Sequence, residues 1–375
     1  FIGSHIVDLY IKNGYEVVVV DDLSTGKAEY INPKAKFYKL DVKSGVNELN
    51  VNDPKLEDIF KEERPDIVNH HAAQISVSAS VKYPIFDANV NILGTLNLLE
   101  NCIKYGVKKF IFASTGGAIY EETDKLPVDE NHKLKPLSPY GVSKLAIENY
   151  LYFYKKVHHL DSIIFRYSNV YGPRQDPYSE AGVVAIFTEK MLKGESPIIN
   201  GDGNQTRDFI YISDAAKANL LALNFSLENK KKGFTDLKDE LKNTNENEVA
   251  FKEKFGSNNK SNKTSKERSE SKNKKGNNII EKDKNTNNET IINDIAIFNI
   301  GTGIETSINE LFYKLKKITK AKKITNANIK EIHGPQKMGE LRRSCLNSNK
   351  AKEILGWKPR IDIEQGLKLT INYFK

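Results

Sequence analysis

The sequence predicts an α/β fold in which a parallel sheet is covered by helices and a smaller α/β domain follows. Short, continuous apolar runs such as residues 17–20 and 109–113 indicate strands that are buried on both faces, as parallel strands are. Amphipathic helical patterns alternate with these runs, and this alternation is typical of parallel strands joined by crossover helices. At 375 residues, the chain is long enough for two such domains.

The elements follow one another in a regular order. Residues 3–14 have the periodicity of an amphipathic helix, which Gly14 ends. Residues 15–20 and 36–42 then predict two strands of the sheet. The remaining elements are expected as follows: a helix at 56–63, a strand at 66–71, a helix at 84–105, a strand at 109–113, a helix from 139, helices at 180–193 and 213–223, a strand at 295–300, and helices at 307–319, 349–355 and 362–374.

Residues 228–294 break this pattern. They are rich in Lys, Asn, Glu and Ser, with three phenylalanines and no Tyr or Trp. That is too little apolar surface to offset the entropy lost on ordering, so we expect a disordered insertion. The fold can carry it, because the entropic cost of loop closure grows only slowly with length.

The net charge of +8 raises the question of an acidic partner such as nucleic acid. The insertion holds 16 basic and 13 acidic residues, so the excess is spread along the chain instead of forming one binding stripe. We therefore expect a solvated surface with some attraction for a negatively charged small molecule, and no nucleic-acid partner. Weak binding of RNA or of another protein by the insertion is the alternative.

The cysteines and the apolar runs bear on location. Cys102 and Cys345 are the only two cysteines, which gives no disulfide framework and suits a reducing compartment. The sequence has no apolar run of eighteen residues, and no signal peptide can be recognised. We expect a cytoplasmic protein that does not contact a membrane.

The strongest chemical signal is the stretch 138–144, Ser-Pro-Tyr-Gly-Val-Ser-Lys. If a helix begins near Pro139, Tyr140 and Lys144 lie one turn apart on the same face. A phenol is a weak base at neutral pH, and an ammonium beside it favours the phenolate. The pair therefore predicts proton transfer, although a solvated pair on a helix has the same spacing.

Other motifs accompany this pair in a fixed order. They are the strand that ends at Ser114-Thr115, and the stretches 165–174, 201–212 and 298–303. Together they resemble the extended short-chain dehydrogenase/reductases, and within that family they look most like the UDP-glucose 4-epimerases. The resemblance covers residues 1–226 and 295–375.

The resemblance implies a fold, a cofactor and a reaction. The fold is a Rossmann-type doubly wound parallel sheet with a smaller α/β substrate-binding domain. The cofactor is NAD, the substrate is a UDP-sugar, and the reaction is epimerisation of UDP-glucose and UDP-galactose through a 4-keto intermediate by a homodimer. The implied domains are an NAD-binding domain at 1–170, a substrate-binding subdomain with interleaved Rossmann elements at 171–227 and 295–375, and the insertion at 228–294.

The beginning of the chain bears on cofactor binding. Residues 1–3 match the tail of the family's glycine-rich turn, with Gly3 as its last glycine. The rest of such a turn presents backbone N–H groups to the cofactor pyrophosphate. Without it, we expect the chain as given to bind a dinucleotide poorly.

The other expected cofactor residues follow strands. Asp21 and Asp22 end the strand predicted at 15–20, where a carboxylate accepts ribose hydroxyls and repels a 2′-phosphate, which favours NAD over NADP. Ala72, Ala73 and Gln74 follow the strand predicted at 66–71. Small residues at the C-terminal end of a strand let a cofactor approach the backbone. The resemblance adds the remaining cofactor contacts: Asp41, Val42, Asn91, Tyr140, Lys144 and Tyr167. His70 and His71 are adjacent on a strand and point to opposite faces, so no metal site is expected.

The resemblance also implies the catalytic and substrate residues. The catalytic residues are Thr115, Tyr140 and Lys144. The substrate-binding residues are Thr115, Tyr140, Asn169, Val183, Arg207, Lys337, Glu340 and Ser344. Lys337 stands where the family usually has arginine, so it keeps the charge and loses the planar fork that binds two phosphate oxygens. Ser344 is small, which favours acceptance of N-acetylated sugars.

Three alternatives stay open. A sugar-nucleotide dehydratase of this family carries Asp-Glu after the threonine, where this chain has Gly116-Gly117. A UDP-glucuronate decarboxylase or epimerase would keep the same catalytic residues. A cofactor-sensing binding module would keep the fold without the chemistry, but such modules typically lose the tyrosine or the lysine, and both are present.

Overall fold

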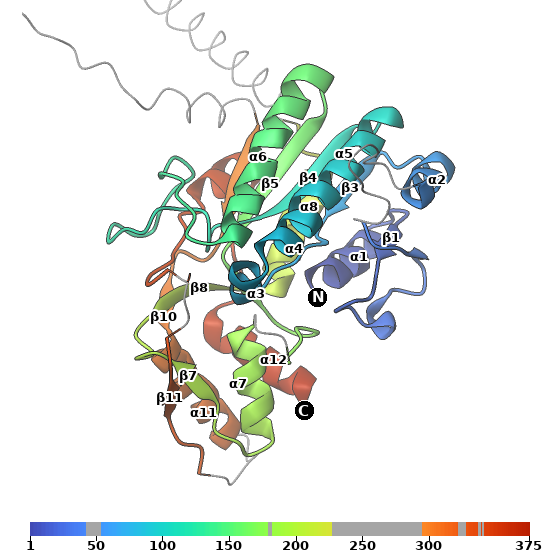
Figure 1. Cartoon of the computed structure of the whole chain (residues 1–375). Coiled ribbons are helices and arrows are strands. Elements are labelled where there is room, and N and C mark those ends of the chain that lie inside the picture. Colours follow the sequence, from blue (N-terminus) through green and yellow to red (C-terminus); the bar gives the residue numbers. More distant parts are fainter. Residues whose placement is uncertain (43–53, 179–181, 227–294, 322–327, 337–338, 340) are drawn as a thin grey trace, which may run out of the picture. The chain divides into compact units, whose positions relative to one another are not determined.

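The structure is a computed structural model that describes residues 1–42, 54–178, 182–226, 295–321, 328–336, 339 and 341–375 (Figure 1). The insertion predicted at 228–294 lies outside the described residues. The elements below all belong to one of the two units of the chain, which comprises Phe1–Phe225 and Thr290–Lys375.

A four-stranded parallel sheet forms the first core. Its strands lie in the order β3 (Ile67–His70), β4 (Lys109–Thr115), β5 (Asp161–Tyr167) and β9 (Ala296–Ile300). Every neighbouring pair is parallel, so the carboxyl ends of all four strands meet at the same edge. The predicted strands at 66–71, 109–113 and 295–300 are thereby confirmed.

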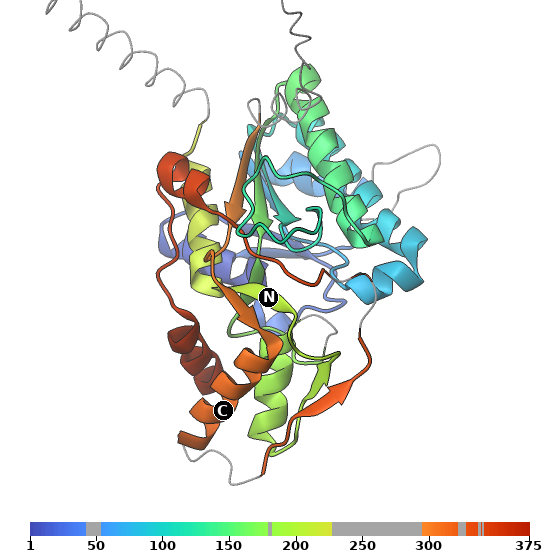
Figure 2. The same cartoon turned by 90° about the vertical axis from the view of Figure 1, so that its left-hand side faces the viewer.

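Helices cover both faces of this sheet. Figure 2 shows the helices α5 (Gly94–Lys104) and α6 (Pro139–His158) on one face and α8 (Ile212–Leu223) on the other. Helix α2 (Pro54–Glu63) joins α5 and α6 in one apolar cluster. Phe110 and Phe112 project into that cluster from β4 and are fully buried, which is why this apolar run is stable only as an interior strand.

The helix expected at 84–105 is interrupted. It consists of α4 (Pro84–Ala88), a π-helical turn (Asn89–Leu93) and α5. A short helix, α3 (Val77–Lys82), precedes it and was not predicted; Ser76 caps it by accepting a hydrogen bond from the Ala79 amide. The π-helical turn is a common feature of functional sites.

The first two strands form a sheet of their own. Helix α1 (Ile2–Lys12) leads to β1 (Val18–Asp21), which pairs in parallel with β2 (Lys36–Lys39); a 3-10 turn (Ala28–Tyr30) lies between them. The predicted sheet is thus divided into two hydrogen-bonded sheets, and Asn69 of β3 bonds the Tyr10 hydroxyl of α1 at 2.8 Å. Both sheets are parallel and covered by helices, so the predicted α/β fold is confirmed.

A second core contains shorter strands. Strands β6 (Asn169–Tyr171), β8 (Thr206–Tyr211) and β10 (Glu305–Ser307) form one sheet, and β7 (Ile198–Asn200) pairs with β11 (Ile332–Gly334). Figure 1 shows the helices α7 (Val183–Leu192), α11 (Ile308–Ala321) and α12 (Ile363–Phe374) close to β7, β10 and β11. The helix expected at 349–355 is a π-helical turn, Ala351–Leu355. No helix among the described residues has the length and apolar character needed to cross a membrane.

Candidate active site

Thr115, Tyr140 and Lys144 come together at the carboxyl edge of the four-stranded sheet. Thr115 is the last residue of β4, and α6 begins at Pro139 behind a cap in which the Ser138 hydroxyl accepts the Gly141 amide at 3.2 Å. Because α6 starts there, Tyr140 lies in its first turn and Lys144 one turn later. The Thr115 hydroxyl is a hydrogen-bond partner of the Tyr140 phenol.

The amine of Lys144 is buried beside this pair. Its Nζ donates to the carbonyl of Ala113 at 2.9 Å and lies 4.8 Å from the ring centre of Phe112 and 5.9 Å from that of Tyr140. An ammonium has three donors, so two more remain for a ligand in this geometry. Lys144 can thus hold an oxygen-rich group next to the phenol.

Burial dominates the acidity of both groups. It raises the pKa of Tyr140 to about 12, and the hydrogen bond with Thr115 only partly offsets this. Burial also lowers the pKa of Lys144 to about 8, while the carboxylates of Asp87 and Glu148 act in the opposite direction. The pKa of the phenol is therefore raised by burial and, to a smaller extent, by the Asp87 carboxylate, which is opposite to the lowering expected from the neighbouring lysine.

A buried ion pair supports the end of β4 and was not anticipated from the sequence. The guanidinium of Arg166 is 1 % exposed and donates to both oxygens of Glu148, with Nη2–Oε2 at 2.6 Å. Glu148 also accepts from Ser114, the residue before Thr115, and Arg166 donates to the Tyr120 hydroxyl at 2.9 Å. The network fixes the strand end from which the Thr115 hydroxyl projects.

The residues expected to hold a cofactor line the same edge. His71 follows β3, and its Nε2 is buried without a partner among the described residues, as is the hydroxyl of Ser168 after β5. Burial lowers the pKa of His71 to about 3, so the ring is neutral at physiological pH. The unpaired Nε2 of His71, which precedes the small Ala72 and Ala73 in the chain, and the unpaired hydroxyl of Ser168 fit a polar ligand such as NAD.

The loop after β3 is held by a side chain. Asn91, in the π-helical turn, accepts the Gln74 amide and donates to the Gln74 carbonyl, both at 2.9 Å. Its expected contact with the cofactor stays a prediction, because the structure uses its amide to fix Gln74. Tyr167 is buried, and its hydroxyl accepts from Asn219 at 2.7 Å.

The residues expected at the adenosine end occupy β1, β2 and α1. One oxygen of Asp21, the last residue of β1, accepts the Leu23 amide at 2.8 Å, and Asp22 accepts the Ser24 amide and hydroxyl. Asp41 follows β2, and Val42 packs in the core of the first domain. No heavy atom lies within 4 Å of the position a Cβ would take at Gly3, in the first turn of α1.

The substrate side converges on Gly117. A Cβ built there would lie 3.8 Å from Asn169 Oδ1, 3.9 Å from Ser344 Oγ and 3.9 Å from Thr115 Oγ1. Thr115 ends β4 and Asn169 begins β6, whereas Ser344 lies more than 200 residues after Gly117 in the sequence. A glycine at this point leaves the space between them for a ligand.

Arg207 borders this region from β8. Asn169 pairs with Phe209 across the sheet, and Arg207 lies two residues before Phe209 on the same strand. Its Nη1 donates to the neighbouring Thr206 carbonyl at 2.8 Å. Val183 is the first residue of α7 and packs against the second core. Lys337 and Glu340 lie outside the described residues.

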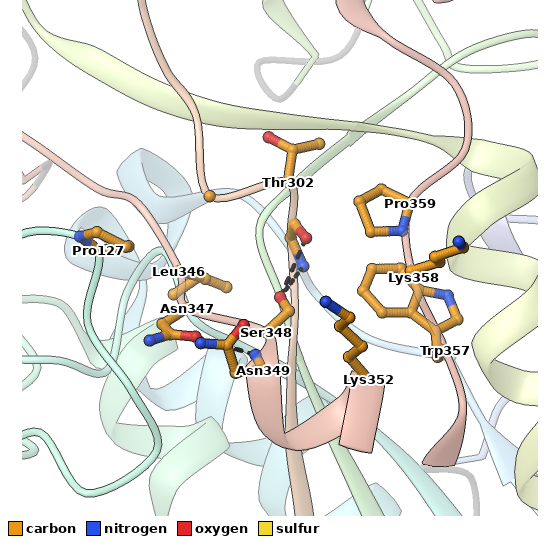
Figure 3. Close-up of a pocket in the computed structure, with 12 residues that line it drawn as sticks. Pro127, Thr302, Leu346, Asn347, Ser348, Asn349, Lys352, Trp357, Lys358 and Pro359 are labelled. Atoms are coloured by element: carbon orange, nitrogen blue, oxygen red, sulfur yellow. Dashed lines mark hydrogen bonds between the residues drawn. The ribbon is translucent and has the colours of Figure 1, made fainter. Parts of the chain in front are cut away.

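A separate cavity of about 230 Å³ lies elsewhere and contains none of the predicted site residues (Figure 3). The loop 301–303 forms one wall, but the Thr302 and Gly303 amides donate to Asp208 and the Gly301 amide donates to Ser348. The buried indole of Trp357 donates to the Asp214 carbonyl. These backbone and indole donors are thus used within the protein. Among the residues that the structure describes, no cluster of three potential metal ligands is present.

The chain is similar to proteins of one family along its length. Residues 1–234 match the model of the NAD dependent epimerase/dehydratase family. A UDP-glucose 4-epimerase of Mycolicibacterium smegmatis is 33% identical, and the match covers 100% of this chain and 96% of that protein. The crystal structure of a UDP-glucose 4-epimerase from Thermotoga maritima with UDP-glucose superimposes with a TM-score of 0.76 and 42% identity, over 100% of this chain and 95% of that one. A Thermus thermophilus UDP-glucose 4-epimerase in complex with NAD gives a TM-score of 0.75 and 33% identity, over 100% and 96% of the two chains.

Proposed function

Because the chain belongs to the NAD dependent epimerase/dehydratase family, we propose that it is an isomerase that interconverts UDP-glucose and UDP-galactose with bound NAD. The observation that carries the proposal is the convergence of Thr115, Asn169 and Ser344 on the space beside Gly117. Thr115 is also the partner of the Tyr140 phenol, so a sugar in that space has one hydroxyl next to a proton acceptor.

Each residue of the site then has its own role in the reaction. Tyr140, once ionised, takes the proton of the sugar 4-hydroxyl, and Thr115 donates a hydrogen bond to the same oxygen. Because burial raises the pKa of the phenol, the positive charges of Lys144 and of the oxidised cofactor would have to favour the phenolate when the site is filled. Lys144 keeps a positive charge near the phenol and has donors left for a cofactor ribose. NAD, when bound, supplies the acceptor and then the donor of the C4 hydride. The 4-keto sugar turns within the site so that its opposite face receives the returning hydride, and Tyr140 gives the proton back to the C4 oxygen.

The packing at Gly116 argues against dehydration. A Cβ at Gly116 would lie 2.4 Å from Leu346 Cδ1, so the acidic residue that a dehydratase carries there would have to displace the buried Leu346 side chain. Elimination needs an acid and a base beyond the phenol, and this position does not provide them. Epimerisation needs neither.

Ser344 bears on the choice of sugar. Its hydroxyl lies at the space beside Gly117, and its small side chain favours a substrate with an N-acetyl group in addition to the plain hexoses. A larger residue would fill that space. Failure to turn over UDP-N-acetylglucosamine, in an enzyme active on UDP-glucose, would contradict this part of the proposal.

We also propose a homodimer in the cytoplasm. Helix α6 carries exposed apolar side chains at Val142, Phe153 and Val157, a face that a second copy of the chain would cover. Both cysteines are free and buried, which fits a reducing compartment. Light scattering of the purified protein would give the mass of a monomer if the dimer is wrong.

The function is tested by incubating the purified protein with NAD and UDP-glucose and analysing the sugar nucleotides by NMR. The expected product is UDP-galactose, and the reverse reaction must reach the same equilibrium mixture. A 4-keto-6-deoxy sugar would indicate a dehydratase, and release of carbon dioxide from UDP-glucuronate would indicate a decarboxylase. No product from any of these would favour a binding module.

A further inference from the structure

Asp87 is a buried carboxylate between the catalytic helix and the loop that follows β3. It is 0 % exposed, although it belongs to the short helix α4. Its Oδ2 accepts the hydroxyl of Ser143 at 2.6 Å, and its Oδ1 accepts Nε2 of Gln74 at 2.7 Å and Nδ2 of Asn91 at 3.0 Å. All of these donors are neutral. Among the described residues, no cation forms an ion pair with this carboxylate.

The hydrogen bonds of Asp87 join two parts of the candidate site. Ser143 is the residue before Lys144 on α6, so one oxygen of Asp87 is tied to the helix that carries the catalytic pair. Gln74 belongs to the cofactor-side loop, and Asn91 bonds both Asp87 and the backbone of Gln74. A shift of Asp87 would therefore move both the helix and the loop.

The charge of Asp87 acts on the catalytic pair. The titratable groups that influence Lys144 or are influenced by it are Asp87 from α4, Glu148 and Tyr140 from α6, His70 from the end of β3 and His71 just after it. Both histidines have a lowered pKa because of burial, so they are neutral at physiological pH. The negative charges near the amine are therefore those of Asp87 and Glu148.

These two carboxylates differ in their partners. Glu148 is held by Nε and Nη2 of the Arg166 guanidinium, which compensates its charge. Asp87 has only neutral donors, so its field reaches Lys144 without a nearby opposing charge. Its carboxylate raises the pKa of Lys144, in opposition to the larger effect of burial.

We propose that Asp87 is a positioning residue of the reaction, which clamps α6 to the cofactor-side loop and supplies the uncompensated negative charge that keeps Lys144 an ammonium. This inference rests on the proposed function for its catalytic meaning. Its electrostatic part can be measured without turnover.

The test is the variant Asp87→Asn. An asparagine can keep every contact, with its NH₂ facing the Ser143 hydroxyl and its oxygen facing Gln74 and Asn91. The fold and the KM for the UDP-sugar should therefore change little. The alkaline limb of the kcat profile should move down by about one pH unit, because Lys144 loses its proton earlier.

A readout besides activity is the titration of Lys144 followed by NMR of ¹³Cε-labelled lysine, with the signal assigned by its loss in Lys144→Met. In Asp87→Asn the pKa of Lys144 should fall below its wild-type value. An unchanged titration would overturn the inference even if the enzyme is active, whereas an inactive wild type with a shifted titration would overturn the proposed function alone.

Ser143→Ala separates the clamp from the charge. It removes the contact with α6 and keeps the Asp87 side chain, so kcat should fall about tenfold while the pH profile keeps its shape. If Asp87→Asn does not fold, this variant still decides the clamp, because an unchanged kcat would refute it. Asp87→Glu, which restores a carboxylate, should recover the alkaline limb.

Discussion

At the end of β4, the side chains around Thr115 are buried and hydrogen-bonded to one another, whereas those around Gly117, two residues later, come from short strands and distant loops. The first group is fixed before any ligand arrives, by the Arg166–Glu148 pair and by Lys144 on the Ala113 carbonyl. The second is a set of polar atoms around a space. The difference suggests that the chemistry depends on a rigid support and that the choice of sugar depends on what fills the space.

The largest expected effect on activity comes from the phenol. Tyr140→Phe removes the proton acceptor and should lower kcat by about 10²–10⁴-fold, the usual contribution of a general acid–base group, with no change in fold. Rates of UDP-galactose formation measure it. Tyr150→Phe, on the exposed side of the same helix, is the matched control and should be fully active.

The rigid support is tested by Glu148→Ala. The change leaves the Arg166 guanidinium buried without its carboxylate, so the free energy of unfolding should fall by about 3–5 kcal/mol. Urea denaturation measures it. A variant as stable as the wild type would mean that the end of β4 does not need this pair.

The open region is tested by Gly117→Ala. The added methyl would lie at 3.8–3.9 Å from its three polar neighbours, which is ordinary contact, so the protein should fold normally. It would, however, occupy the space of the sugar, and kcat/KM should fall by about tenfold to a hundredfold. A wild-type kcat/KM would show that the substrate does not use this space.

The pH profile of the wild type tests the charge of Lys144, which belongs to the buried group around Thr115. The pKa of Lys144 is lowered to about 8 by burial, so the ammonium is present below pH 8 and is lost as the pH rises. If the reaction needs the ammonium, kcat should fall about tenfold per pH unit above 8. A rate that stays level to pH 10 would remove Lys144 from the charged role assigned to it.

The smallest effect is expected at an exposed ion pair. Arg342 donates to both oxygens of Asp202 at 2.7 Å through Nη1 and Nη2, so this pair is bidentate, as is Arg166 with Glu148, but both of its partners are exposed. Because water screens such pairs, Arg342→Ala should leave the denaturation midpoint close to that of the wild type. A loss of stability as large as that of Glu148→Ala would contradict the expectation that a buried ion pair stabilises the fold more than an exposed one.

Local patterns explain which parts could be predicted from the sequence. The spacing of Tyr140 and Lys144, the serine cap before Pro139 and the strand that ends at Thr115 are all short-range features, and helix and strand geometry turn them directly into positions. The helices 307–319 and 362–374 follow from their periodicity for the same reason, and the structure has helices there.

Contacts between distant residues could not be predicted in this way. Asp87 reaches Ser143 across 56 positions, and no pattern in either segment indicates it. The gathering of Thr115, Asn169 and Ser344 beside Gly117 depends on the register of β6 with β8 and on a loop near the end of the chain. The pKa of Tyr140 depends on burial, which the spacing of charges in a sequence does not reveal.

The most direct test of the account uses UDP-glucose labelled with deuterium at C4 of the sugar, with the purified protein and NAD. If Tyr140 moves only the hydroxyl proton and the hydride leaves and returns to the same carbon, UDP-galactose should keep the deuterium at C4, and reaction in D₂O should add none. Loss of the label to solvent, or a product dehydrated at C6, would contradict the account.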